Sequence, residues 1–107
     1  MKVVISNDFS ETPGGRYKKE GKYSGEEFRE KLLAVCYLEA KEKGEKLVVD
    51  LDGTYGYATS FLDEAFGGLA RKFKSDDILK IIEFKSDDQP SLVDDILSYI
   101  RTGKVTE

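Results

Sequence analysis

The sequence predicts an α/β fold in which a small mixed or parallel sheet packs against about three helices. Short apolar runs suited to strands alternate along the chain with longer segments whose apolar residues recur at helical spacing. The chain has 107 residues, which is enough for one hydrophobic core and no more. We therefore expect a single domain that spans residues 1–107.

The first predicted strand is followed by a long segment without periodicity. Residues 3–5 (Val-Val-Ile) suit a short strand, whereas residues 8–23 contain the turn signal Pro13-Gly14-Gly15. A hairpin about Gly14 and Gly15, with a return strand over residues 16–18, is one interpretation of this segment.

The first predicted helix begins after Ser24 and ends near Gly44. Ser24 and Glu27 have the spacing of a capping box, and glycine is typical just beyond the end of a helix. The apolar positions of this helix predict one buried stripe. Its members are Phe28, Leu32, Val35, Cys36 and Ala40, with Leu33 and Tyr37 beside them.

The second half of the chain alternates strand and helix. The predicted elements are a strand over 47–51, a loop over 52–58, a helix to about residue 73, a strand over 78–84 and a helix from Pro90 to Gly103. Because helical segments connect the strands, the crossovers predict parallel pairing.

Composition argues against several classes of function. The chain has 17 basic and 21 acidic residues, and its net charge of −4 argues against a nucleic-acid-binding surface. It has no histidine, and its one cysteine, Cys36, cannot form an intrachain disulfide. No apolar run approaches the roughly 20 residues that a membrane span needs. We expect a cytoplasmic protein without a membrane partner.

One short motif, Asp50-Leu-Asp-Gly-Thr54, follows the predicted strand over 47–51. It resembles the nucleophile motif of haloacid-dehalogenase-type phosphatases. In that family the first aspartate attacks phosphorus, the second is the general acid, and Mg²⁺ bridges carboxylate and phosphate. The resemblance implies a small Mg²⁺-dependent phosphohydrolase that uses Asp50 and Asp52.

The rest of the chain does not follow the phosphatase pattern. That family carries its nucleophile on the first strand and its serine or threonine, lysine and further acidic pair on later strands. Here a strand and a full helix precede Asp50, and the segment 85–88 (Lys-Ser-Asp-Asp) would place all later groups on one strand end. We therefore keep the phosphohydrolase as an alternative and expect no catalytic residue, metal ion or cofactor.

Longer segments carry a second resemblance. They are Gly14-Gly-Arg16, Ser24-Gly-Glu-Glu-Phe-Arg29, Val48-Val-Asp-Leu-Asp52 and Gly56-Tyr-Ala-Thr-Ser-Phe-Leu-Asp-Glu-Ala-Phe-Gly-Gly-Leu69. These segments are similar to a STAS-like family of unknown function, a divergent relative of the anti-sigma-factor antagonists. The resemblance implies a STAS-like fold and a non-catalytic signalling module. It also implies a protein partner, a histidine-kinase-like ATPase.

The resemblance further implies a candidate phosphoacceptor. In the anti-sigma-factor antagonists the loop ends Asp-Ser-Ser-Gly, and the second serine accepts the phosphate. Those four positions correspond to Ala58, Thr59, Ser60 and Phe61. Ser60 is therefore the matching hydroxyl, with Thr59 beside it. Ala58 and Phe61 depart from the pattern. Ser60 followed by Asp63 is also an ordinary helix N-cap pattern, and both interpretations stay open.

The loop before this helix contains the candidate partner contacts. Tyr55 and Tyr57 follow the C-terminal end of a strand, where α/β proteins usually carry function, and exposed tyrosines are good interface anchors. Equally, one tyrosine could pack over the helix while the other covers the sheet edge. We assign Asp50, Asp52, Tyr55, Tyr57 and Phe61 to a partner-binding surface, and the helical spacing also predicts a core position for Phe61.

Gly14, Gly15 and Arg16 form a third candidate site. With the N–H groups of residues 59–62 they would contact an anion, which makes a phosphate- or nucleotide-binding module the third class of function. Alternatively, Arg16 would pair with the two strand-end aspartates if the glycine turn folds back towards them. The exposed edges of a small sheet can pair between copies, so we expect a monomer or a weak homodimer.

Overall fold

A computed structural model describes residues 1–103, in which three parallel strands form a sheet. Strands β1 (Lys2–Val4), β2 (Leu47–Asp50) and β3 (Ile82–Lys85) lie side by side in that order. The pairing aligns Val3 with Val49 and Val49 with Phe84. The α/β class with parallel pairing is confirmed. Residues 104–107 of the predicted domain lie outside the described residues.

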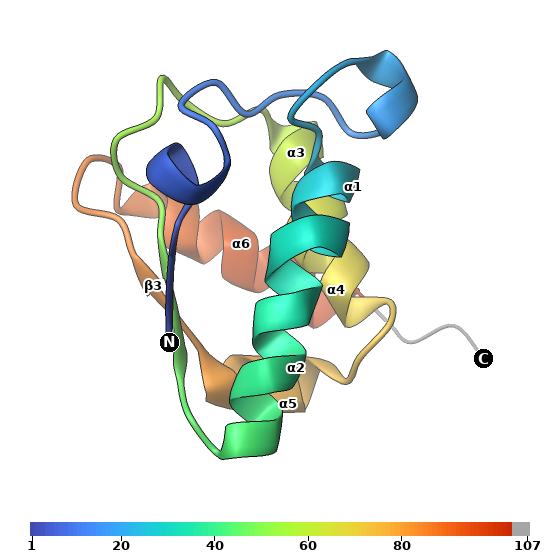
Figure 1. The fold of residues 1–107 in the computed structure, drawn as a ribbon, viewed down its shortest axis with the longest axis vertical. Helices are drawn as coiled ribbons and strands as arrows, with labels where there is room; N and C mark the ends of the chain where they lie inside the picture. Colours follow the sequence, from blue (N-terminus) through green and yellow to red (C-terminus); the bar gives the residue numbers. More distant parts are fainter. Residues whose placement is uncertain (104–107) are drawn as a thin grey trace.

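Helical segments connect the strands (Figure 1). The first long segment consists of α1 (Gly25–Phe28), η3 (Arg29–Leu33) and α2 (Ala34–Lys43), and the second consists of α3 (Thr59–Leu62), η4 (Asp63–Gly67) and α4 (Gly68–Ala70). The others are α5 (Ser75–Ile81), α6 (Ser91–Thr102) and the short turns η1 (Ile5–Phe9) and η2 (Lys18–Glu20). No helix among residues 1–103 is long and apolar enough to cross a membrane.

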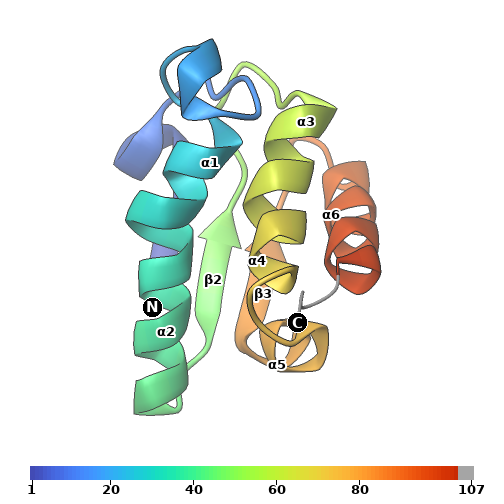
Figure 2. The same ribbon diagram turned by 90° about the vertical axis from the view of Figure 1, so that its right-hand side faces the viewer.

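The core lies between one face of the sheet and the helices. Figure 2 looks onto the helices, with β2 and β3 behind them. Val3, Val49 and Ile82 are buried, whereas their strand neighbours Lys2 and Glu83 are exposed. This alternation follows from the two-residue period of a strand. The opposite face of the sheet therefore carries charged side chains.

The first long helix begins as predicted, but its buried stripe differs from the prediction. Ser24 Oγ accepts the Glu27 N–H at 3.1 Å, which confirms Ser24 as the N-cap residue. Val35 is 54% exposed, so its assignment to the core was wrong. Residues 29–33 form a π-helical turn, which accommodates about one extra residue. The stripe therefore continues from Phe28 through Leu33.

The third strand begins later than predicted, at residue 82 rather than 78, because residues 75–81 form α5. Asp76 and Asp77 lie in the first turn of α5, where the helix dipole favours negative charge. Ile78, on the helix, and Ile82, on the strand, are both buried. Periodicity cannot separate helix from strand in an apolar run this short.

The hairpin about Gly14 and Gly15 was also wrong, because residues 16 and 17 form no strand and residues 18–20 form a helical turn. Instead, this loop passes over the start of α1. The Gly15 and Arg16 carbonyl oxygens accept the N–H groups of Gly25 and Glu26, each at 3.0 Å. The loop thus satisfies two N–H groups that the helix cannot satisfy itself.

Gly25 sets the distance between α1 and α3. A Cβ atom at Gly25 would lie 2.5 Å from the Phe61 carbonyl oxygen, which is too close for any real contact. Only glycine therefore permits the start of α1 to approach the backbone of α3.

We expect Gly25→Ala to lower the free energy of unfolding by about 1–3 kcal/mol, because the two backbones must separate. Urea unfolding followed by circular dichroism measures this change. Gly14→Ala is the matched control, since a Cβ atom at Gly14 meets nothing within 4 Å. Equal stability of the two variants would contradict the close approach.

Candidate functional site

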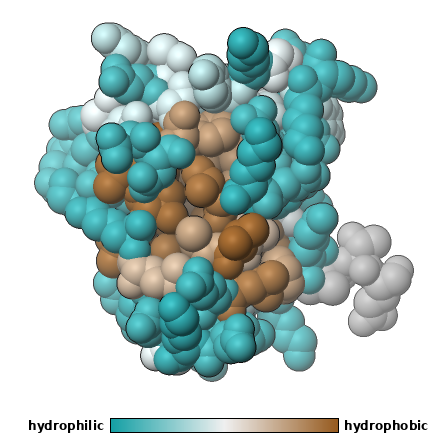
Figure 3. Space-filling view, viewed as in Figure 1, coloured by the Kyte–Doolittle hydropathy of each residue, from teal (hydrophilic) through white to brown (hydrophobic). Residues whose placement is uncertain are grey.

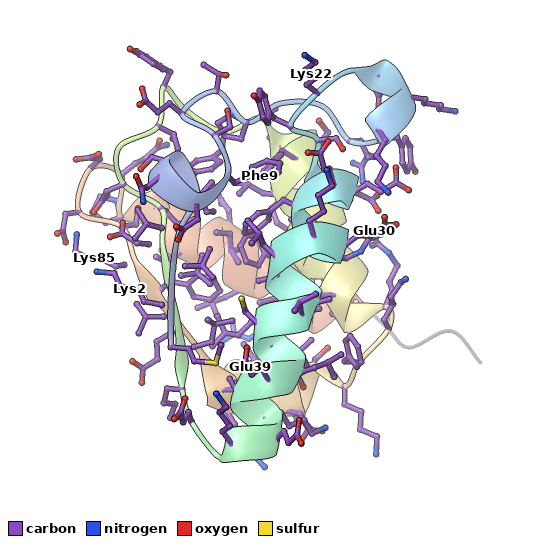
Figure 4. The ribbon with its side chains drawn as sticks, viewed as in Figure 1. Lys2, Phe9, Lys22, Glu30, Glu39 and Lys85 are labelled. Carbon is purple, nitrogen blue, oxygen red and sulfur yellow. The ribbon has the colours of Figure 1, made fainter. Side chains whose placement is uncertain are left out.

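Acidic and basic side chains meet where β2 and β3 end. Asp50 is aligned with Lys85 in the parallel register, and Asp52 follows β2 by two residues. The Lys85 ammonium lies 2.8 Å from the Asp52 carboxylate, 3.9 Å from that of Asp50 and 3.0 Å from that of Asp87. Figure 4 shows Lys2 and Lys85 projecting from the sheet away from the helices.

The Asp52 carboxylate is fully engaged. It accepts a hydrogen bond from Lys85 Nζ at 2.8 Å and from the backbone N–H groups of Asp87 and Asp88 at 3.1 and 2.9 Å. The bond from Lys85 is the main reason that the pKa of Asp52 falls to about 2. The same bond raises the pKa of Lys85. Asp52 therefore fastens the loop after β2 to the loop after β3.

Asp50 lies beneath this contact and is buried. Its Oδ1 accepts the Asp52 N–H at 2.9 Å, which closes the turn after the strand. Its other oxygen is 3.8 Å from the Lys2 ammonium. Within residues 1–103, no group of three or more histidine, cysteine or acidic side chains is arranged to hold a metal ion.

The loop after β2 is held at several points along its length. Gly53 donates its N–H to the Asp88 carboxylate at 3.1 Å, and the Tyr55 N–H bonds the Glu11 carbonyl at 2.9 Å. The Tyr57 hydroxyl donates to the Leu51 carbonyl at 2.8 Å, and burial raises the pKa of Tyr57 to about 12. The Tyr55 side chain, by contrast, is 84% exposed.

The helix that follows the loop begins at Thr59, whereas an N-cap at Ser60 would start it at Phe61. Ala58 is the N-cap residue, and no side chain caps the helix there. The interpretation of Ser60 as the N-cap was therefore wrong: Ser60 lies in the first turn, half-buried, beside the exposed Thr59. Phe61 is fully buried, which confirms its core position and removes it from any partner-binding surface.

Arg16 lies away from the strand-end aspartates. Its guanidinium donates to Asp63 at 2.7 Å and to Glu64 at 3.5 Å, so the predicted pairing with the two strand-end aspartates was wrong. The hydrogen bond to Asp63 is the main cause that raises the pKa of Arg16. Gly14 and Gly15 hold the loop through their backbone groups, with Gly14 N–H donating to the Tyr23 carbonyl at 3.0 Å.

Comparison with protein families assigns this chain to a family. The model of a family described as a STAS-like domain of unknown function matches residues 24–92. The chain belongs to this family. Comparisons with curated proteins and with solved structures found no match.

The match covers the STAS-like domain from the cap of α1 to the start of α6. It includes the strand-end aspartates, the loop 52–58 and the hydroxyl residues at the start of α3. Strand β1 and the Gly14–Arg16 loop lie before it. The candidate loop thus lies within the matched region, whereas Gly14, Gly15 and Arg16 do not.

Sequence reasoning missed a buried ion pair inside the matched region. Arg29 donates from Nη1 to the Glu64 carboxylate at 2.5 Å and to the Glu64 carbonyl at 2.6 Å. A Cβ atom at Gly68 would clash with this guanidinium. The Gly67-Gly68 pair, which costs helix stability, was the available signal that something packs closely there.

The Asp52 titration tests the strand-end cluster. We expect the Asp52 carboxyl to titrate at about 2 in carboxyl-carbon NMR, well below its ordinary 3.8. A lowered pKa stabilises the fold above pH 3.8, and this stabilisation is lost as the pH falls through 2. Lys85→Met should move the midpoint up towards the ordinary value.

Lys80→Met is the control, since Lys80 is an exposed lysine outside the cluster. This variant should leave the Asp52 midpoint near 2. A midpoint that does not respond to Lys85→Met would show that the ammonium does not hold the carboxylate.

Proposed function

We propose that this STAS-like domain is a non-catalytic protein-interaction module. Its contact surface, which we call the loop 52–60, consists of the loop 52–58 and the first two residues of α3. The observation that carries the proposal is the exposure of Tyr55 on a fixed backbone. The Tyr55 N–H is bonded to Glu11, yet 84% of the residue remains exposed. An aromatic side chain on a pre-positioned loop loses little conformational freedom when a partner covers it.

The adjoining hydroxyl residues would make this surface switchable. Thr59 is exposed and Ser60 half-exposed in the first turn of the helical segment 59–70. Phosphorylation there adds about −1.5 to −2 charges near a helix N-terminus, whose dipole favours negative charge. A partner matched to the bare hydroxyl would then be repelled. The partner class we propose is a histidine-kinase-like ATPase in the cytoplasm, which would transfer phosphate from ATP to Ser60.

The state of the aspartates favours a binding role over phosphohydrolase chemistry. The Asp52 carboxylate already accepts hydrogen bonds from Lys85 Nζ and from the backbone N–H groups of Asp87 and Asp88, and its lowered pKa disfavours the protonated form that a general acid needs. Asp50 is buried and accepts the Asp52 N–H. Both carboxylates therefore act as supports for the loop. Arg16, in turn, pairs with Asp63 and Glu64, so its charge is already balanced, which disfavours the anion-binding alternative.

Ser60→Asp tests the switch. We expect it to weaken binding to the cognate histidine-kinase-like ATPase of the source organism by more than about tenfold, because like charges then meet at the interface. Biolayer interferometry with the folded chain measures the affinity. Ser98→Asp, on an exposed position of α6, adds the same charge elsewhere and should leave the affinity unchanged.

Tyr55→Ala should weaken the same complex without lowering the stability of the fold. Equal affinities of wild type, Ser60→Asp and Tyr55→Ala for the ATPase would show that the loop 52–60 is not the contact surface. If the chain binds no histidine-kinase-like ATPase of the organism, the proposed class of partner is wrong.

A phosphatase assay tests the alternative directly. With Mg²⁺ and p-nitrophenyl phosphate, we expect wild type and Asp50→Asn to release phosphate at the same background rate. Asp95→Asn, at an exposed position of α6, controls for a change in charge. Mg²⁺-dependent turnover that Asp50→Asn abolishes and Asp95→Asn retains would replace the binding proposal with an enzyme.

A further inference from the structure

The outer face of α2 carries apolar side chains that the fold does not cover. Val35 is 54% exposed and Leu38 47% exposed. Cys36 on the same helix and Met1 before β1 are also partly exposed. Figure 3 shows hydrophobic residues gathered over α2 and β1 in the middle of this face, with hydrophilic residues around them.

The two most exposed apolar residues of α2 belong to one stripe. Val35, Leu38 and Glu42 of α2 follow one another at intervals of three and four residues, which places them on one side of the helix. Lys31, in the preceding turn η3, lies about one turn before Val35. Lys31 and Glu42 are exposed as well. The stripe thus has a basic end, an apolar centre and an acidic end.

This order of charges does not favour the helix itself. Acidic residues stabilise the first turn and basic residues the last turn, so Glu42 in the last turn of α2 opposes the dipole. Glu42 stands between Lys41 and Lys43, which have the favourable sign. The pattern is instead suited to a partner that carries the opposite polarity along its length.

A second copy of the same helix, running antiparallel, has that polarity. A two-fold axis midway between residues 35 and 38 places Val35 of one copy opposite Leu38 of the other. Because residues 31 and 42 have the same midpoint, the axis also places Lys31 of each copy opposite Glu42 of its mate. An isologous contact repeats each pair twice. We propose that the Lys31–Glu42 face of η3 and α2 is a homodimer interface.

The sheet edges fit a second copy less well. The Val4 N–H, on the outer edge of β1, already bonds the Asp8 carboxylate at 2.8 Å. β1 is only three residues long, and β3 carries the charged residues Glu83 and Lys85. Short and charged edge strands resist pairing between chains. The α2 face is therefore favoured over the sheet-edge contact that the sequence suggested.

The dimer is expected to be weak. A contact built on one helical stripe buries less than the roughly 1,200–2,000 Å² of a stable interface. Its apolar centre consists of two residues per copy, and its ends are solvent-exposed ion pairs. The interface is also separate in sequence from the loop 52–60, so dimerisation does not depend on the partner proposed for that loop.

Sedimentation equilibrium over a concentration series up to about 1 mM tests the interface. Wild type should show a monomer–dimer equilibrium, and Leu38→Asp should be monomeric throughout. Lys31→Glu should weaken association about tenfold, because two attractive pairs become repulsive. Adding Glu42→Lys to that variant should restore the wild-type constant. Tyr55→Asp, which adds a negative charge on the loop 52–60 instead, should dimerise like wild type.

Disulfide formation tests the register. In a Cys36→Ala background, oxidation of mixed Val35→Cys and Leu38→Cys chains should yield the heterodimer well above the two homodimers, since only unlike positions are opposed. A wild-type chain that stays monomeric at about 1 mM overturns the proposal. So does a dimer that survives Leu38→Asp, or a charge reversal that the second substitution fails to rescue.

Discussion

The buried ion pair between Arg29 and Glu64 joins the two helical segments on which the rest of the domain depends. Arg29 is 6% and Glu64 7% exposed, so neither charge can return to water while the fold is intact. Removing one partner of such a pair leaves an uncompensated charge and costs about 3–5 kcal/mol. The pair thus constrains how the segments 25–43 and 59–70 lie against each other, with Gly68 providing the necessary space.

The Glu64 carboxylate also contacts the N-terminal loop. Arg16 contacts Glu64 as well as Asp63, and its backbone carbonyl accepts the Glu26 N–H at the start of α1. The loop is thereby fixed against both helical segments. A charge cluster that looks like an anion site in sequence has a structural role, because its positive groups are matched by acidic ones.

A second charge cluster, exposed at the other side of the sheet, supports the loop 52–60. Lys85 and the backbone of Asp87 and Asp88 hold Asp52, and this fixes the loop from which Tyr55 projects. The two clusters have different roles. The buried Arg29–Glu64 pair constrains the helix packing, and the Asp52–Lys85 cluster positions the surface proposed to bind a partner.

Local sequence determined the elements whose signals lie within a few residues: the Ser24 cap, the Pro90 start of the last helix and the buried strand over 47–50. It also located the acidic strand end and the hydroxyl residues after it. Tertiary structure alone decided the exposure of Val35, the helix over 75–81 and the partner of Arg16. Arg16 and Asp63 are 47 residues apart, and their contact depends on how the N-terminal loop packs over α1 and η4. Caps and periodicities are local, whereas ion pairs between distant residues and a shifted helical stripe exist only after packing.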